Sequence, residues 1–297
     1  MWFKAGASAK IMMFPQRAKA RPFRDLCGLA PSLGCVGSLE VRLATTKRDI
    51  RKAQRLRYKV FYEEGAARPD ATMALIRRDV CPFDRICDHL IVIDHAARTS
   101  RLGRLQPKIV GTYRLLRQDV AALNGGFYSA RQFDIAPLLA RHSGARFLEL
   151  GRSCVLGPWR GKPTLDLLWR GLWAYVRHHQ IDVMIGCASF PGTDPLAHAA
   201  SFGFLAIHAR AEDTWQVRPQ AVRGAPVQAF DPAIGDPRKA LAALPPLIKG
   251  YVRVGARFGD GAVVDRQFGT TDVFVVMPVA DIAARYATHF SDVARAA

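Results

Sequence analysis

The apolar residues of this chain alternate between strand spacing and helix spacing, and the order of these patterns predicts its secondary structure. Residues 39–44 alternate as a short strand, and Thr46 then provides the N-cap of a helix that runs to about residue 62. That helix carries an apolar stripe made of Ile50, Ala53, Leu56, Val60 and Phe61. The charged, turn-rich residues 65–83 predict a loop after it.

Two more strands are expected in the next stretch, at 89–94 and 109–116. A polar and basic hairpin connection over 95–108 joins them. The second strand contains Arg114, a charge inside an otherwise apolar run. Because a buried charge needs a partner, this position is a candidate for a functional site.

The most informative stretch reads R-F-L-E-L-G-R-S-C-V-L-G-P-W-R-G-K-P-T-L-D-L-L. It predicts a strand over 147–156, a turn at R-G-K, and a helix from Pro163 to about residue 179. A buried strand at 182–190 and a short helix capped by Asp194 and closed by Gly203 follow. This succession of strands and helices predicts a mixed α/β sheet.

Composition sets the domain organisation that we expect. The chain has 297 residues, 49% of them hydrophobic, which is enough for one large packed domain. We expect an N-terminal basic arm over 1–37 and a single domain over 38–297. Within it, residues 38–216 form the core and 217–297 a proline-rich excursion that ends in strands at 251–257 and 273–277 and a helix from about residue 281.

The formal net charge of +18 indicates an anionic partner. The arm contributes Lys4, Lys10, Arg17, Lys19, Arg21 and Arg24 against the single acid Asp25, and no apolar run is long enough for a membrane span. We therefore expect a cytoplasmic protein whose arm lies on an anionic membrane surface. The alternatives are a disordered tail, or a true start at Met12 or Met13.

Glu149 and Arg152 are the candidate catalytic residues. A carboxylate inside the apolar strand F-L-E-L-G must be paired, and Arg152 is the nearest cation. Residues three apart in a regular strand face opposite sides, but a bulge at Gly151 would bring both to one side. The pair either holds neighbouring loops together or presents a carboxylate that accepts a proton from an amine substrate.

The R-G-K turn is the candidate cofactor-binding element. The backbone N–H groups from Arg160 to Thr164, including Gly161, with the side chains of Arg160 and Lys162, would hold a phosphate at the positive end of the helix. The alternative is an ordinary basic surface turn.

Further candidates are polar groups near the predicted strands. Arg57 and Phe61 share a helix face, and Asp84 and Asp88 precede a strand where they would hold an ammonium group or cap the loop. We expect no metal site, because Cys81, Cys87 and His89 match no common metal pattern and lack a fourth ligand.

Several of these segments together resemble a known family. L-R-Y-K-V-F-Y-E-E, D-R-I-C-D-H-L-I-V-I-D, G-T-Y-R-L-L, F-L-E-L-G-R-S-C-V and W-R-G-K are similar to the bacterial ornithine N-alpha-acyltransferases of ornithine-lipid synthesis. They are more distantly similar to acyl-homoserine-lactone synthases. The resemblance covers most of the chain but not the basic arm, and it implies the fold of the GCN5-related N-acyltransferases (GNAT).

The resemblance also implies an activity and a set of roles. A 3-hydroxyacyl chain, carried on the phosphopantetheine of acyl carrier protein, would pass to the α-amine of L-ornithine to give lyso-ornithine lipid. Glu149 would act as base with Arg152 orienting it, and the positions shared with the lactone synthases would shape the substrate site: Arg57, Phe61, Asp84, Asp88 and Arg114. Pro163 stands where acetyl-CoA users of this fold usually carry glycine, which favours a carrier protein as donor.

Three other functions compete with this one. A lactone synthase would cyclise a different substrate, and the long C-terminal extension argues against it. A glycerolipid-type O-acyltransferase uses H-x-x-x-x-D, which His89 and Asp94 match, but their odd separation places them on opposite strand faces. We expect no nucleic-acid binding, because the sequence carries no recognisable nucleic-acid-binding motif.

Overall fold

One large mixed sheet organises the protein. The computed structural model describes residues 26, 28–101, 104–220 and 236–282. Eight strands follow the order β1-β2-β3-β4-β6-β7-β10-β9, and every neighbouring pair is antiparallel except β6 and β7. Their bounds are β1 Gly34–Val36, β2 Leu39–Leu43, β3 Asp88–Arg101, β4 Arg104–Arg117, β6 Phe147–Val155, β7 Val183–Pro191, β9 Arg257–Asp265 and β10 Thr270–Pro278. A two-stranded sheet pairs β5 Phe133–Asp134 with β8 Arg218–Pro219.

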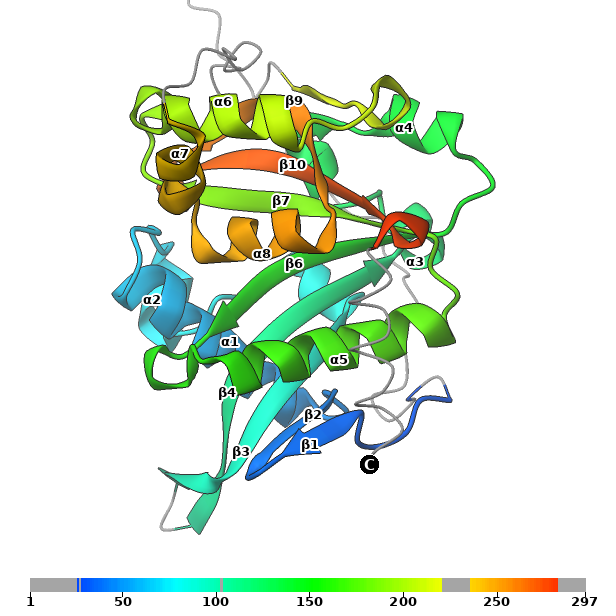
Figure 1. The fold of residues 1–297 in the computed structure, drawn as a ribbon. Coiled ribbons are helices and arrows are strands. Elements are labelled where there is room, and N and C mark those ends of the chain that lie inside the picture. Colours follow the sequence, from blue (N-terminus) through cyan, green and yellow to red (C-terminus); the bar gives the residue numbers. More distant parts are fainter. Residues whose placement is uncertain (1–25, 27, 102–103, 221–235, 283–297) are drawn as a thin grey trace, which may run out of the picture.

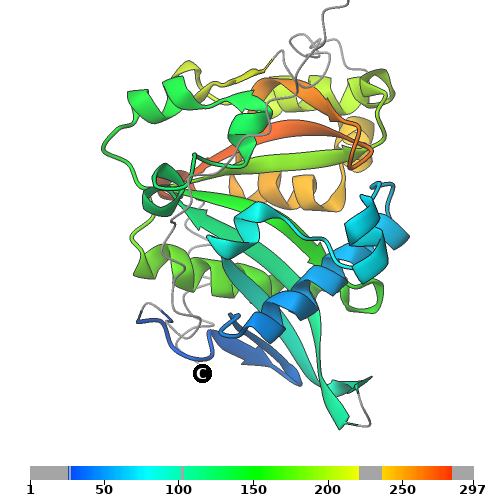
Figure 2. The same cartoon turned by 180° about the vertical axis from the view of Figure 1, so that it is seen from behind.

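Helices cover both faces of the large sheet. The helices α5 Lys162–His178, α6 Ala199–His208, α7 Pro237–Ala243 and α8 Pro246–Val254 lie on the face seen in Figure 1. The helix α1 Lys47–Tyr58 crosses the opposite face, with α2 Ala71–Ile76 beside it (Figure 2). Two short helices, α3 Gln118–Ala122 and α4 Ala136–Arg141, precede β6. Among the described residues, no helix is both long and apolar enough to cross a membrane.

Local sequence explains the predicted elements that the structure confirms. Thr46 caps α1, its Oγ1 accepting a hydrogen bond from the Asp49 N–H at 3.0 Å. The helix continues past Tyr58 as a π-helical turn to Glu63, which accounts for the expected end near residue 62. The predicted strand at 147–156 is β6, and the helix expected from Pro163 is α5. The strand predicted at 273–277 lies within β10.

Several boundaries differ from the sequence-based expectations. The polar residues 95–108 do not form a simple connection, because β3 and β4 continue through them to residues 101 and 104. The segment 65–83 contains α2. Gly203 does not close α6, which runs to His208 because the glycine is buried within the helix.

The strand predicted at 251–257 is wrong. Its first part belongs to α8, because Ile248, Tyr251 and Val254 recur at helix spacing and face the core. Gly255, at φ +97°, ends that helix and only then does β9 begin.

Two expectations concern the ends of the chain. Part of the range expected for the arm belongs to the folded domain, since β1 pairs with β2 and Leu29 and Leu33 are buried in the core. The remainder of the arm, residues 1–25, and the helix expected from 281 onward, beyond Ile282, lie outside the described residues.

Candidate active site

The site is created where two parallel strands part. Four residue pairs join β6 to β7, from Phe147 opposite Val183 to Leu150 opposite Gly186. Beyond them β6 continues beside β4 and β7 continues beside β10, so the two strands no longer pair with each other. Gly186 forms the last of these pairs. A side chain does not fit at this position, because a Cβ there would lie 2.5 Å from the carbonyl oxygen of Leu150.

A β-bulge sits at this branch point. Thr112 of β4 pairs with Cys154 and Arg114 pairs with Gly151, so Arg152 and Ser153 together oppose one residue of β4. Arg152 has a left-handed backbone, with φ +52°. The sequence predicted a bulge at Gly151, and the structure places the left-handed residue one position later. Arg152 therefore departs from the regular alternation of side chains.

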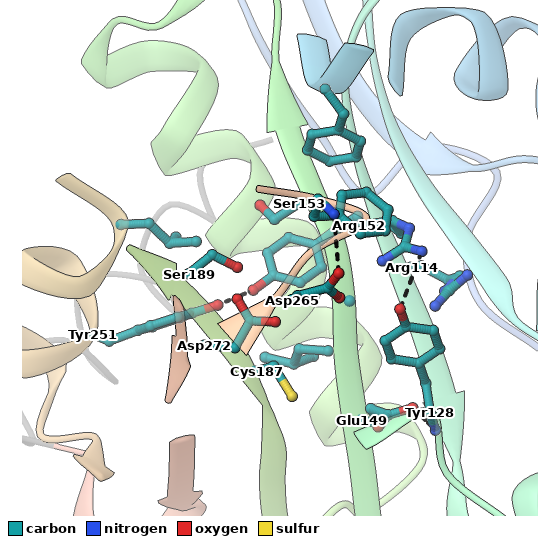
Figure 3. Close-up of a pocket in the computed structure, with 16 residues that line it drawn as sticks. Arg114, Tyr128, Glu149, Arg152, Ser153, Cys187, Ser189, Tyr251, Asp265 and Asp272 are labelled. Carbon is teal, nitrogen blue, oxygen red and sulfur yellow. Dashed lines mark hydrogen bonds between the residues drawn. The ribbon is translucent and has the colours of Figure 1, made fainter. Parts of the chain in front are cut away.

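A pocket of about 190 Å³ occupies the opening between the strands. Figure 3 shows Arg114, Tyr128 and Glu149 on one side and Ser189, Tyr251 and Asp272 on the other, with Asp265 between them. The remaining lining residues are Phe61, Tyr113, Leu150, Gly151, Arg152, Ser153, Cys187, Leu247 and Phe268. The pocket thus combines arginines from β4 and β6 with aspartates from β9 and β10.

Glu149 is buried, and polar groups of one loop surround its carboxylate. Its oxygens accept hydrogen bonds from the Tyr128 N–H at 2.8 Å, the Ser129 N–H at 2.6 Å and the Ser129 Oγ at 2.5 Å. Burial raises the pKa of Glu149 above its usual range, and these hydrogen bonds partly oppose the rise. Glu149 thus lines the pocket with a carboxylate of increased proton affinity.

The expected ion pair between Glu149 and Arg152 does not form. Arg152 instead lies near Asp79, with Nε 3.4 Å from Oδ2. Its guanidinium also lies over the rings of Phe268 and Tyr128, at 4.3 and 4.9 Å from their centroids. The two residues are linked indirectly, because Tyr128 donates through its N–H to Glu149 and accepts at its hydroxyl from Arg152 at 3.4 Å.

Three of the other predicted residues belong to a buried ionic cluster that we call the Arg57 cluster: Arg57, Asp79, Asp84 and Arg114. Arg57 is fully buried and donates to Asp79 Oδ2 and Asp84 Oδ2, each at 2.7 Å. Arg114 adds a longer contact to Asp84 Oδ1 at 3.5 Å. Burial alone would raise the pKa of Asp84, but the neighbouring charges, led by Arg57, hold it well below the usual range.

Phe61 and Asp88 have different surroundings. Phe61 lines the pocket and meets Phe268 edge to face, with centroids 5.9 Å apart. Asp88 does not line it, and its Oδ2 accepts from the Tyr175 hydroxyl at 2.6 Å. Asp84 also faces its arginines within the Arg57 cluster. The structure therefore does not bring the two aspartates together as an ammonium site.

The R-G-K turn lies at the start of α5, away from the residues that line the pocket. Gly161 is the N-cap and provides no side chain for capping, so the first-turn N–H groups face outward at a basic turn. Arg160 donates to the Val155 carbonyl at 2.9 Å and to Glu64 at 2.6 Å, and Lys162 pairs with Asp166. Thr164 is buried with its methyl group facing Gly111, so its side chain is not presented at the surface of the turn.

The alternative dyad of His89 and Asp94 is absent as a unit. His89 Nε2 lies 3.0 Å from the Asp84 carbonyl, and Asp94 Oδ2 accepts from Trp159 Nε1 at 2.9 Å. Burial lowers the pKa of His89 to about 4. In the described part of the chain, no group of three or more histidine, cysteine or acidic residues is arranged to hold a metal ion.

Sequence reasoning missed the acidic side of the pocket. Asp272 sits inside the apolar run T-T-D-V-F-V-V, the same kind of signal that singled out Glu149 and Arg114. Asp265 reads as a turn residue, and its Oδ1 does accept from the N–H groups of Gln267 and Phe268, both at 2.9 Å. Tyr128 and Ser129, the partners of Glu149, lie in a loop whose contacts no local pattern reveals.

Comparison with known proteins places the chain. Residues 56–170 match the model of an acetyltransferase (GNAT) domain. An L-ornithine N(alpha)-acyltransferase of Rhizobium meliloti is 50% identical over 93% of this chain and 90% of its own length. One from Agrobacterium fabrum is 51% identical over 86% of both chains. The solved structure of an N-acyl amino acid synthase from uncultured soil microbes is 10% identical, over 82% of this chain and 92% of its own, with a TM-score of 0.47.

The family assignment rests on the percentage identity to these relatives and on the share of the chain that the matches cover. Two relatives that share half of their residues with this chain extend well beyond the matched GNAT segment. The match to the Rhizobium meliloti protein reaches the strands that carry the acidic side of the pocket, since it covers 93% of the chain. The chain is an acyltransferase with a GNAT fold, and it belongs to the family of L-ornithine N(alpha)-acyltransferases.

Proposed function

We propose that this protein transfers a 3-hydroxyacyl chain from acyl carrier protein to the α-amine of L-ornithine, which is the first step of ornithine-lipid synthesis. The observation that carries the proposal is the 50% identity, over 93% of the chain, to a relative named for this acceptor. The product would be lyso-ornithine lipid.

Glu149 is the proposed base. The α-ammonium of the acceptor, with a reference pKa of about 8, is mostly charged at neutral pH and must lose a proton before it can attack. Glu149 lines the pocket, and its burial raises its proton affinity. After proton transfer, the amine nitrogen attacks the thioester carbonyl, the new C–N bond forms, and the C–S bond breaks to release the carrier thiol.

The bulge is the proposed place for the developing negative charge. Arg152 and Ser153 share one partner residue on β4, and their backbone borders the pocket. An N–H group directed at the oxyanion typically contributes about 3 kcal/mol to transition-state stabilisation. Arg152, which contacts Tyr128 beside Glu149, positions the base through that residue.

The donor is proposed to approach from the start of α5. Gly161 and Lys162 present backbone N–H groups at the helix N-terminus, and Arg160 and Lys162 add positive charge, which suits the single phosphate of phosphopantetheine. The net charge of +18 suits an acidic carrier protein. We further propose that the protein acts in the cytoplasm, with the basic part of the arm that precedes Leu29 at the anionic inner face of the membrane.

Lipid analysis tests the reaction. The protein is expressed in a bacterium that makes no ornithine lipid, beside a Glu149→Gln variant, and extracted lipids are analysed by mass spectrometry. We expect a hydroxyacyl-ornithine species with the unchanged protein and its loss with the variant. If folded, abundant protein gives no acylated ornithine, the proposed acceptor or donor is wrong, and acyl-homoserine lactones in the medium are the next product to seek.

A further inference from the structure

The acidic side of the pocket contains two carboxylates without a cation. Asp265 ends β9 and is half-buried, Asp272 lies in β10 and is buried, and both line the pocket. Neither forms an ion pair with a lysine, arginine or histidine of the described ranges, in contrast to the aspartates of the Arg57 cluster. A buried carboxylate beside a second, half-buried one, without a counter-ion for either, is unfavourable unless a ligand supplies one.

Neutral groups satisfy these carboxylates only in part. Gln132 Nε2 donates to Asp272 Oδ2 at 2.8 Å and to Asp265 Oδ2 at 3.3 Å, and Thr270 donates to Asp272 Oδ1 at 2.9 Å. Gln132 is itself buried, and its Oε1 has no hydrogen-bond partner in the described structure. The two pocket-lining carboxylates thus share one amide donor and one hydroxyl donor and keep acceptor positions free, and an ammonium group has three N–H donors to meet them.

Another part of the pocket lining carries positive charge. Arg114 and Arg152 line it from β4 and β6, and β7 lies between β6 and β10 in the sheet. The strands β6 and β10 are therefore two strand spacings apart, which is about 10 Å where neighbouring strands pair. Side chains from both strands reach into the pocket between them. The arginines and Asp272 therefore lie on different sides of the pocket, with Asp265 between them and Glu149 on the side of Arg114 (Figure 3).

We propose that Asp265 and Asp272 bind the side-chain ammonium of the acceptor amino acid and so select a dibasic acceptor. Its α-carboxylate would then face the arginines, which leaves the α-amine near Glu149. This assignment rests on the proposed function, since it deals with the acceptor of that reaction. It predicts that a charged side chain, rather than its length alone, decides acceptance.

Binding and turnover of a charged and a neutral acceptor test the assignment. L-ornithine is compared with L-norvaline, which has the same carbon chain but no terminal amine, using the full chain and its Asp272→Asn and Asp265→Asn variants. Binding is measured by calorimetry, and kcat/KM with a hydroxyacyl carrier protein. Asp260→Asn is the matched control, because Asp260 lies on β9 outside the pocket in an exposed pair with Arg210.

For Asp272→Asn we expect affinity and kcat/KM for ornithine to fall on the order of 100-fold, because charge-assisted hydrogen bonds are lost. The values for norvaline should stay within about twofold. Asp265→Asn should act in the same direction with a smaller effect, since its Oδ1 serves the turn. Asp260→Asn should leave both substrates unchanged.

Two results would overturn the assignment. An equal loss for ornithine and norvaline would give Asp272 a general role in catalysis or folding, and unchanged discrimination would place the ammonium elsewhere. Binding separates this inference from the proposed reaction. If ornithine binds in an Asp272-dependent manner but is not acylated, the acceptor site stands and the proposed reaction fails.

Discussion

Two groups of aspartates, one in the Arg57 cluster and one in the lining of the pocket, differ in what neutralises them. In the Arg57 cluster, Asp79 and Asp84 face arginines of the same chain at 2.7 Å. In the pocket lining, Asp265 and Asp272 face only neutral donors of the described chain. The difference teaches that a buried charge paired within the chain serves the fold, whereas one left unpaired beside a cavity is available to a substrate.

The largest effect on stability is expected from removing the central arginine of the Arg57 cluster. Arg57→Met should lower the free energy of unfolding by about 3–5 kcal/mol, because it leaves two buried carboxylates without their main partner. Urea denaturation measures it. Arg146→Met, which removes an exposed pair with Asp182, should cost about 1 kcal/mol or less. Equal costs for the two variants would contradict a structural role specific to the cluster.

Glu149 combines features of both groups, because it is hydrogen-bonded within the chain and also lines the pocket. Glu149→Gln should lower kcat by about 100-fold or more, because the amide cannot accept the proton. It should also cost about 1–3 kcal/mol of stability, because one of the Tyr128 and Ser129 N–H groups then faces an NH₂ group.

Ser129→Ala separates these two effects. It removes one hydrogen bond to Glu149 but keeps the carboxylate, so most of the turnover should remain. Steady-state kinetics at matched folded fractions provide the measurement. Intact turnover in Glu149→Gln would show that the base lies elsewhere.

The junction between the two sides should be sensitive to small volume changes. Gly186→Ala should destabilise the protein by about 1–3 kcal/mol, because the new Cβ would lie 2.5 Å from the Leu150 carbonyl oxygen. Gly144→Ala is the control, since a Cβ added there would meet nothing within 4 Å. Thermal unfolding of the two variants gives the comparison, and a neutral Gly186→Ala would mean that the strands can separate there without loss.

The smallest expected effect is on the pH dependence of stability, and it has opposite signs for Asp272 and Asp84. Burial raises the pKa of Asp272 in the folded protein above the value of about 3.9 that it has in the unfolded chain. The free energy of unfolding therefore falls as the pH rises from about 3.9 through the folded pKa. Asp272→Asn should therefore raise the free energy of unfolding by about 1 kcal/mol at neutral pH.

Asp84 provides the comparison. Its folded pKa is lowered, so its contribution to stability is present above about 3.9 and is lost as pH falls through the folded value. Asp84→Asn should thus destabilise the protein at neutral pH. Urea denaturation of both variants between about pH 4 and pH 8 shows the signs. A loss of stability in Asp272→Asn like that in Asp84→Asn would assign Asp272 to the fold.

Local patterns predicted the elements that carry their own signals. Strand β6, helix α5 and the Thr46 cap follow from apolar spacing and capping residues within the segment. Helix α8 was mistaken for a strand because its short apolar run fits both periods, and packing against the core decides between them. The continuation of α6 through Gly203 is likewise decided by burial.

The sequence pointed to some of the residues that line the pocket, Phe61, Arg114, Glu149 and Arg152, but not to their pairings. Arg114 and Glu149 were recognised because charges interrupt apolar patterns, and Arg57 because it shares a helix face with Phe61 and matches the family resemblance. Their partners lie 20 to 30 residues away in sequence, at Asp79, Asp84 and Ser129, so no local rule could assign them. The expected Glu149–Arg152 pair failed for this reason, since each residue found a better partner across a loop.

The short contact between β6 and β7 has a mechanical consequence. Only four residue pairs join the strands β1, β2, β3, β4 and β6 to the strands β7, β10 and β9. A sheet held by so short a seam bends most easily along that line, because few backbone hydrogen bonds resist the motion. The compliance of the sheet is therefore expected at the pocket that we propose as the acyl-transfer site.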